Sequence, residues 1–117
     1  MPDINKAILE KANAAIVNGD HEKFLLFCTD DTEWIFVGDK TLRGKDAVRQ
    51  YMAVAYKEPP KFVVANLIEE GDFLTAVGDI KMKDKEGNEV SYKYCDVWRF
   101  RDGKMAELRA FVIRDGG

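Results

Sequence analysis

One segment of the 117-residue sequence, Tyr92 to Phe100, holds a single carboxyl group among aromatic side chains. Successive side chains of a β-strand point to opposite faces, so a strand here would carry on one face Tyr92, Tyr94, Asp96, Trp98 and Phe100. An unpaired charge is costly to bury in such surroundings. Asp96 therefore needs a physical explanation.

Two interpretations of Asp96 follow from its position. In the functional interpretation it lines a partly apolar cavity, where desolvation raises its pKa and lets it act as general base, general acid or hydrogen-bond donor. In the structural interpretation it accepts a hydrogen bond from an indole, a phenol or a backbone N–H and only organises the core. The sequence leaves both open.

Residues that share a face with Asp96, or that lie on the equivalent faces of neighbouring elements, form an expected apolar wall around it. The predicted pocket lining is Trp34, Phe36, Tyr51, Ile80, Met82, Tyr92, Tyr94, Trp98, Leu108, Ala110 and Val112. Small residues at Ala76, Gly78 and Ala110 leave room for a cavity, whereas close packing of the same residues is the alternative. Gly78 also fits a bend or bulge in a curved sheet.

The elements that must position these residues follow from the apolar periodicity. Apolar residues spaced by three and four predict a first helix over 3–18, with the face Ile4, Ile8, Ala12, Ala15 and Ile16. Asp20 predicts the N-cap of a short second helix, and a third is expected over 45–57. Strands are predicted over 32–37, 61–69, 73–83, 89–101 and 104–114. A turn at 29–31 is expected to end the second helix, and a turn at 38–40 to follow the first strand. The fold class is α+β, with three amphipathic helices packed on a strongly curved, mainly antiparallel sheet.

Composition narrows the function classes. The chain has 18 basic and 21 acidic residues, a net charge of −3 and 46% hydrophobic residues, with the two signs interspersed. It lacks the basic stripe of a nucleic-acid binder and any apolar run long enough to span a membrane, so we expect one soluble, cytoplasmic domain over residues 1–117. The cysteines, Cys28 and Cys95, lack a paired-thiol spacing and are expected to be reduced.

Other candidate sites are weaker. His21 is the only histidine, which excludes a site of several imidazoles within one chain, and no phosphate or dinucleotide motif occurs, so no cofactor or metal is predicted. His21, Asp79, Arg43 and the pair Asp30–Asp31 are interpreted as surface residues.

The order of these elements and several motifs resemble the nuclear transport factor 2-like superfamily, and within it the SnoaL-like and ketosteroid-isomerase-like proteins. The motifs are Asn18-Gly19-Asp20, Phe27-Cys28-Thr29-Asp30-Asp31 before Trp34, Leu42-Arg43-Gly44-Lys45-Asp46-Ala47-Val48, and the closing hairpin from Asp96 to Glu107. The resemblance implies a cone-shaped α+β barrel, in which a curved sheet surrounds a helix-covered cavity. It also implies that the outer face of the sheet often forms a homodimer.

Function transfers less directly than fold. The resemblance to ketosteroid isomerases places Ala12 where they have a tyrosine and Phe36 where they have the base, and retains only Asp96, so steroid isomerisation is not expected. The epoxide-hydrolase branch uses two carboxylates bridged by an arginine, and neither an inward arginine nor a second inward acid is found. SnoaL-like cyclases are more similar, because a single cavity aspartate serves as their acid–base group. Asp96 is the residue that matches it.

Two functions from different classes remain. In the first, a small, mostly apolar carbonyl or cyclic compound enters the cone, and Asp96 moves a proton in an isomerisation, cyclisation or elimination. In the second, the protein is a non-catalytic ligand-binding or assembly module in which Asp96 is structural. In either case a homodimer is expected, because the outward residues of the last strand, which include Phe111 and Ile113, present apolar surface.

Overall fold

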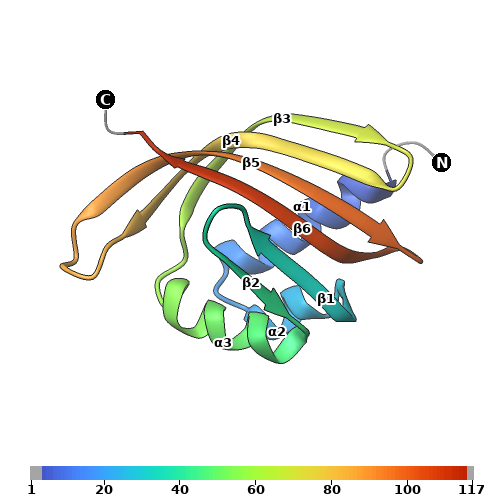
Figure 1. The fold of residues 1–117 in the computed structure, drawn as a ribbon, viewed down its shortest axis with the longest axis horizontal. Helices are drawn as coiled ribbons and strands as arrows, with labels where there is room; N and C mark the ends of the chain where they lie inside the picture. Colours follow the sequence, from blue (N-terminus) through green and yellow to red (C-terminus); the bar gives the residue numbers. More distant parts are fainter. Residues whose placement is uncertain (1–3, 116–117) are drawn as a thin grey trace.

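The computed structural model describes residues 4–115, and in it six strands form one sheet beside three helices (Figure 1). The helices are α1 (Ile4–Val17), α2 (His21–Leu25) and α3 (Lys45–Ala55). The strands are β1 (Cys28–Phe36), β2 (Lys40–Arg43), β3 (Lys61–Glu70), β4 (Phe73–Lys83), β5 (Glu89–Arg101) and β6 (Lys104–Arg114). The α+β class predicted from the sequence is confirmed.

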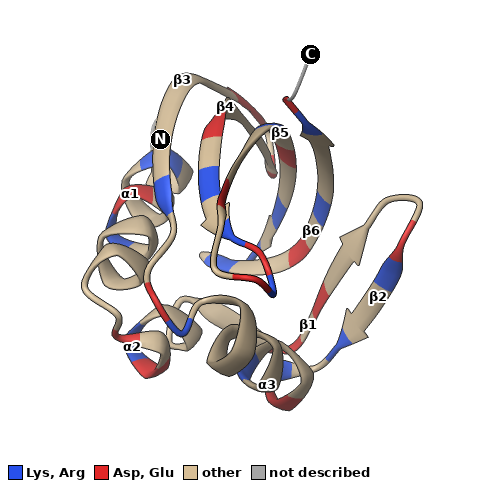
Figure 2. Ribbon diagram, turned by 90° about the vertical axis from the view of Figure 1, so that its left-hand side faces the viewer, with Lys and Arg blue, Asp and Glu red and all other residues tan. Residues whose placement is uncertain are grey.

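The sheet is mixed and open. Its strand order is β2-β1-β6-β5-β4-β3, and every pairing is antiparallel except the parallel pair β1–β6. Because β2 and β3 remain as edges, the sheet is not a closed barrel. Figure 1 shows the long strands β3 to β6 arching over the helices, so the helices lie on the concave side of the sheet. Figure 2 shows basic and acidic residues interspersed over helices and strands.

The first strand and its partner differ from expectation. β1 begins at Cys28 rather than at residue 32, so Thr29-Asp30-Asp31 is strand and not a turn. A tertiary contact extends it: Cys28 pairs with Met105, and the buried Thr32 hydroxyl donates to the Met105 carbonyl at 3.1 Å. The edge strand β2 was not predicted, because its four residues become a strand only by pairing with β1.

Local signals set the ends of the first two helices. Gly19 has φ of 72°, and α1 ends there through hydrogen bonds from the Gly19 N–H to Ile16 and from the Asp20 N–H to Ala15. This is the pattern of a glycine-terminated helix. The Asp20 side chain then accepts from the Lys23 N–H at 3.1 Å, which confirms the predicted N-cap of α2.

The buried face of α1 is shifted relative to the prediction. Its fully or nearly buried residues are Leu9, Ala12, Ala15 and Ile16. Ile4 was expected on this face but is 48% exposed, because it lies in the first turn, away from these core residues. Asp3, the expected first residue of the helix, lies outside the described residues. None of the helices in residues 4–115 is long and apolar enough to cross a membrane.

Gly78 allows the sheet to curve strongly near the edge strand. The register of β3 on β4 shifts between Val64 and Asn66, opposite Gly78 and Val77, which marks a bulge. A Cβ atom on Gly78 would lie 2.0 Å from the Val63 carbonyl oxygen, so only glycine permits this approach. The interpretation of Gly78 as a bend or bulge is confirmed. The resulting curvature brings β3 toward α1.

Candidate functional site

Two adjoining chambers lie between the sheet and the helices. The inner chamber offers about 60 Å³ for the centres of water molecules, and the outer chamber about 270 Å³. A single water requires roughly 10–15 Å³ on this measure, so both chambers hold more than one. The residues that line both are Trp34, Tyr56, Ile80, Tyr94, Asp96 and Leu108. Asp96 therefore lies where the two chambers meet.

The structure brings the residues predicted for the pocket together around these chambers. Trp98 lines the inner chamber only. Predicted residues that line only the outer chamber are Phe36, Tyr51, Met82, Tyr92, Ala110 and Val112. The remaining ones, Trp34, Ile80, Tyr94, Asp96 and Leu108, belong to both. Side-chain alternation along β4, β5 and β6 accounts for this convergence.

Small neighbours on both sides leave space beside the Asp96 carboxyl group. In the register of the sheet, Asp96 lies opposite Ala76 on β4 and opposite Ala110 on β6. Ala76 lines the inner chamber and Ala110 the outer one. A larger residue at either position would fill the space that the carboxyl group faces. The cavity is thus a consequence of residue sizes along one row of the sheet.

The carboxyl group of Asp96 has an unusual environment. Burial raises its pKa to about 7. Among the described residues, the hydrogen bonds and ion pairs include none that the Asp96 side chain makes, so no protein donor offsets the desolvation. Near neutral pH the group is present both as acid and as carboxylate, which is the property that a general acid–base catalyst requires.

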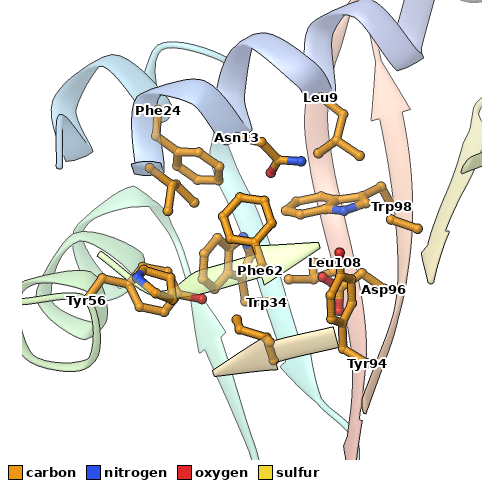
Figure 3. Close-up of a pocket in the computed structure, with 14 residues that line it drawn as sticks. Leu9, Asn13, Phe24, Trp34, Tyr56, Phe62, Tyr94, Asp96, Trp98 and Leu108 are labelled. Atoms are coloured by element: carbon orange, nitrogen blue, oxygen red, sulfur yellow. The ribbon is translucent and has the colours of Figure 1, made fainter. Parts of the chain in front are cut away.

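Two tyrosines, Tyr56 and Tyr94, line both chambers together with Asp96. Tyr56, the residue that caps the end of α3, points its hydroxyl into the cavity from the helix side (Figure 3). Burial raises its pKa far above the usual range, and the charges of Tyr51 and Asp96 raise it further. Burial, with Asp96 as a second cause, raises the pKa of Tyr94 to about 12. Both phenols therefore keep their protons at neutral pH and can donate hydrogen bonds.

Aromatic rings hold the wall of the cavity. Trp34 makes edge contacts with Phe24, Phe36, Tyr51 and Trp98, at ring-centroid distances of 5.8, 6.2, 6.1 and 6.2 Å. Such contacts stabilise a defined arrangement beyond the burial of apolar area. The Trp34 indole N–H is buried without a hydrogen-bond partner in the part of the chain that the structure describes.

Several lining residues were missed from the sequence. They are Leu9, Asn13, Ile16, Phe24, Asp39, Tyr56, Pro60, Phe62 and Ala76, of which Ala76 was noted only as a small position. Leu9, Asn13 and Ile16 are spaced by four and three, so Asn13 is a polar residue on the apolar stripe of α1, a signal that was available. Phe62 and Tyr56 gave no such signal, because their positions depend on how β3 and the end of α3 fold over the cavity.

The weaker candidates lie outside the cavity. Asp79 pairs with Lys93 at 2.7 Å, Arg43 with Glu33 at 3.1 Å, and Asp31 with Arg101 at 2.6 Å. In the part of the chain that the structure describes, the His, Cys, Asp and Glu side chains form no group of three that could hold a metal ion.

A curved sheet with helices on its concave side and one carboxyl group at the centre of an aromatic cavity defines the class of protein. It is a small α+β protein with the fold of solved structures described as NTF2-like, among them a protein from Burkholderia pseudomallei with a TM-score of 0.80 and 19% identity. The family model of the SnoaL-like domain matches residues 9–108, so the chain belongs to the SnoaL-like family. No curated protein matches the sequence at a significant level.

Solved structures have the same fold at low sequence identity. One is the epoxide hydrolase/cyclase-like enzyme SalBIII of pyran ring formation in salinomycin, with a TM-score of 0.85, 19% identity and coverage of 92% of this chain and 89% of that one. Another is a candidate SnoaL-like polyketide cyclase from Jannaschia sp. CCS1, with a TM-score of 0.83 and 17% identity. The match covers 96% of this chain and 88% of that one. A third is TerC, co-crystallised with polyporic acid, with a TM-score of 0.79 and 19% identity. The match covers 92% of this chain and 90% of that one. These similarities show the fold alone.

Proposed function

We propose that this chain is a single SnoaL-like domain that binds a small, mostly apolar carbonyl or cyclic compound in a cone-shaped cavity. There Asp96 transfers a proton to or from carbon, in an isomerisation, a cyclisation or an elimination. The observation that carries the proposal is the position of Asp96 at the junction of the chambers, without a protein partner among the described residues. A structural role would give its carboxyl group a donor to accept from.

The proton transfer follows from the two forms of Asp96. As carboxylate it removes a proton from a carbon next to the ligand's carbonyl group, and the C–H electron pair moves into an enolate. As carboxylic acid it returns that proton to the same or another carbon, so no oxidant or cofactor is consumed. Negative charge builds on the carbonyl oxygen of the ligand. The protonated phenols of Tyr56 and Tyr94 are the candidate hydrogen-bond donors that stabilise this charge.

The relatives support the reaction class. SalBIII is described as epoxide hydrolase/cyclase-like, and the Jannaschia protein as a candidate SnoaL-like polyketide cyclase. Reactions of both kinds require an acid or base placed inside a cavity. Asp39, a second acid that was not expected to face inward, lines the outer chamber but is exposed to solvent, whereas Asp96 lines both chambers. For this chain one enclosed carboxylate favours proton transfer over a chemistry that needs two.

Exchange of carbon-bound protons tests the proposal without knowledge of the natural substrate. The protein is incubated in D₂O with cyclohexanone, 2-cyclohexen-1-one, 1-indanone and 2-tetralone, and loss of the α-proton signal is followed by ¹H NMR. We expect catalysed exchange of at least one ketone and a decrease of about 10²-fold or more in Asp96→Asn. Asp79→Asn is the matched control, because Asp79 is an exposed carboxylate on the neighbouring strand.

The outcomes separate the two functions. Exchange that is equal in wild type and Asp96→Asn removes Asp96 from the chemistry. Ketone binding without any exchange above buffer favours the alternative, a non-catalytic ligand-binding module. Neither binding nor exchange across the set contradicts a site for small ketones.

We also propose that the protein is a homodimer through the outer face of the sheet. Phe111 is 42% and Ile113 69% exposed there, and they lie beside Cys95 and Lys93 of β5. Burial of these side chains would favour association. Sedimentation velocity at micromolar concentration should give a dimer that Phe111→Glu dissociates. A monomeric wild type would contradict the proposal.

The cytoplasmic location stays a prediction.

A further inference from the structure

The inner chamber borders two surface grooves, and one residue lines all three spaces. Phe62 lines the inner chamber, a groove between α1 and β3, and a second groove beside Pro59 and Pro60. Asn13 is shared by the inner chamber and the α1–β3 groove, and Pro60 by the inner chamber and the second groove. Phe62 is thus the residue common to the linings of all three spaces.

The position of Phe62 in the sheet explains how its ring closes the chamber. Phe62 lies on the edge strand β3, opposite Ile80, which lines both chambers. The backbone of β3 comes close to Gly78 of β4, and the bulge at Val64–Asn66 interrupts the regular pairing two residues further along β3. In the view of Figure 3 the Phe62 ring lies among the side chains that line the inner chamber, with Asn13 of α1 above it and Trp34 of β1 below it.

The closure at Phe62 depends on packing. The hydrogen bonds from α1 to the β3–β4 hairpin lie at its other end, where the Asn5 side chain donates to the Gly71 carbonyl and the Lys6 N–H donates to the Glu69 carboxylate. Phe62 stands at the beginning of β3, about eight residues away along a strand that rises about 3.3 Å per residue. The Phe62 side chain can therefore be replaced by a smaller one without removing either of these hydrogen bonds.

Beyond the ring lies apolar surface. The α1–β3 groove is lined by Ala14, Val17, Val64 and Leu67, with Glu10 and Asn66 among its polar residues. Val17 is 57% exposed. An alkyl chain that extended past the position of the Phe62 ring would therefore contact apolar side chains as well as water.

We propose that Phe62 determines the length of the ligand that the site accepts, by closing the inner end of the cavity toward the α1–β3 groove. This inference rests on the proposed function, because it assumes that the cavity binds a small molecule. It assigns the specificity for ligand size to one ring on an edge strand, separately from the proton transfer at Asp96.

A series of alkyl phenyl ketones, from acetophenone to nonanophenone, tests the proposal by quenching of tryptophan fluorescence. In wild type, affinity should rise by up to about fourfold per methylene until the chain meets Phe62, and then fall. In Phe62→Ala the rise should continue, so that nonanophenone binds at least tenfold tighter than to wild type while acetophenone changes less than threefold. Leu67→Ala is the matched control, because Leu67 lines the groove but not the inner chamber.

The failures of the two proposals are distinguishable. If wild type binds the short ketones and Phe62→Ala keeps the same length limit, the assignment of Phe62 is wrong and the proposed function stands. If neither protein binds any ketone, the proposed function fails and the assignment fails with it. If circular dichroism shows that Phe62→Ala does not fold, Phe62→Leu and Phe62→Val are tested instead, because they remove less of the side chain. In both variants the longest ketone that still gains affinity must be longer than in wild type.

Discussion

Replacement of Asp96 by asparagine should stabilise the protein, and the gain should depend on pH. Burial raises the pKa of Asp96 from the usual 3.8 to about 7. Below pH 3.8 the group is protonated in both the folded and the unfolded state and costs nothing extra. As pH rises from about 4 to 7 the unfolded chain loses this proton while the folded protein keeps it, so wild-type stability falls over that window and is level above it.

The magnitude follows from the two pKa values. The difference between about 7 and 3.8 corresponds to a loss of about 4 kcal/mol above pH 8, at about 1.4 kcal/mol for each pH unit. Water in the chambers relaxes around the charge, so a measured loss of about 2–4 kcal/mol is expected. Asparagine has nearly the same shape and does not ionise. Asp96→Asn should therefore be about 2–4 kcal/mol more stable than wild type at pH 8 and nearly equal to it at pH 4.

Urea unfolding at pH 4, 6 and 8, followed by tryptophan fluorescence, measures this difference. Asp79→Asn is the control: its carboxylate is half-exposed and pairs with Lys93 at 2.7 Å, so the variant should gain nothing as pH rises. An Asp96→Asn variant that is no more stable than wild type at pH 8 would refute the reasoning. It would mean that the carboxylate has a partner or full hydration in solution.

Three further predictions concern the sheet, the thiols and the cavity. Gly78→Ala should lower the free energy of unfolding by about 2 kcal/mol or more, measured in urea, because its Cβ would meet the Val63 carbonyl oxygen at 2.0 Å. At pH 8 iodoacetamide should leave Cys28 unmodified in the native protein and modify it in urea, as located by mass spectrometry, because burial raises the pKa of Cys28 to about 12. Ala76→Leu should weaken ketone binding at least tenfold in a fluorescence titration while changing stability by less than about 2 kcal/mol, because leucine fills the space beside Asp96.

Each of these predictions has a clear contrary result. A Gly78→Ala protein as stable as wild type would show that β3 does not approach β4 so closely. An adduct on Cys28 of the native protein would show that the Cys28 thiol is reached by solvent. Unchanged ketone affinity in Ala76→Leu would place the ligand outside the inner chamber.

The face of β5 that lines the cavity was predictable because side-chain alternation is a local rule. Once Tyr92 to Phe100 is a strand, Tyr94, Asp96 and Trp98 must share a face, whatever lies around them. The bounds of β4, β5 and β6 were also predictable, since turn residues separate three long runs with regular alternation. The same rule placed Ala76 and Ala110 on the faces expected to surround the carboxyl group, whereas their position directly opposite Asp96 follows from the strand register of the structure.

Features that depend on distant contacts were not predictable in the same way. β2 and the first residues of β1 become strand through pairing partners rather than through their own composition. Tyr56 and Phe62 enter the cavity because the end of α3 and the edge strand β3 bend over it, and no periodicity within their own segments carries that information. Asn13 is the intermediate case, since its place on the stripe of α1 follows from helical spacing alone.

The titration of the Asp96 carboxyl group tests the central claim most directly, because it requires no ligand. The side-chain carboxyl carbon is observed by ¹³C NMR between pH 3 and 9, and the Asp96 signal is assigned by its absence in Asp96→Asn. The account predicts a midpoint near 7. A midpoint near 4, as for an exposed aspartate, would show that the carboxyl group is solvated or paired and would contradict its proposed role as an acid–base group in an apolar cavity.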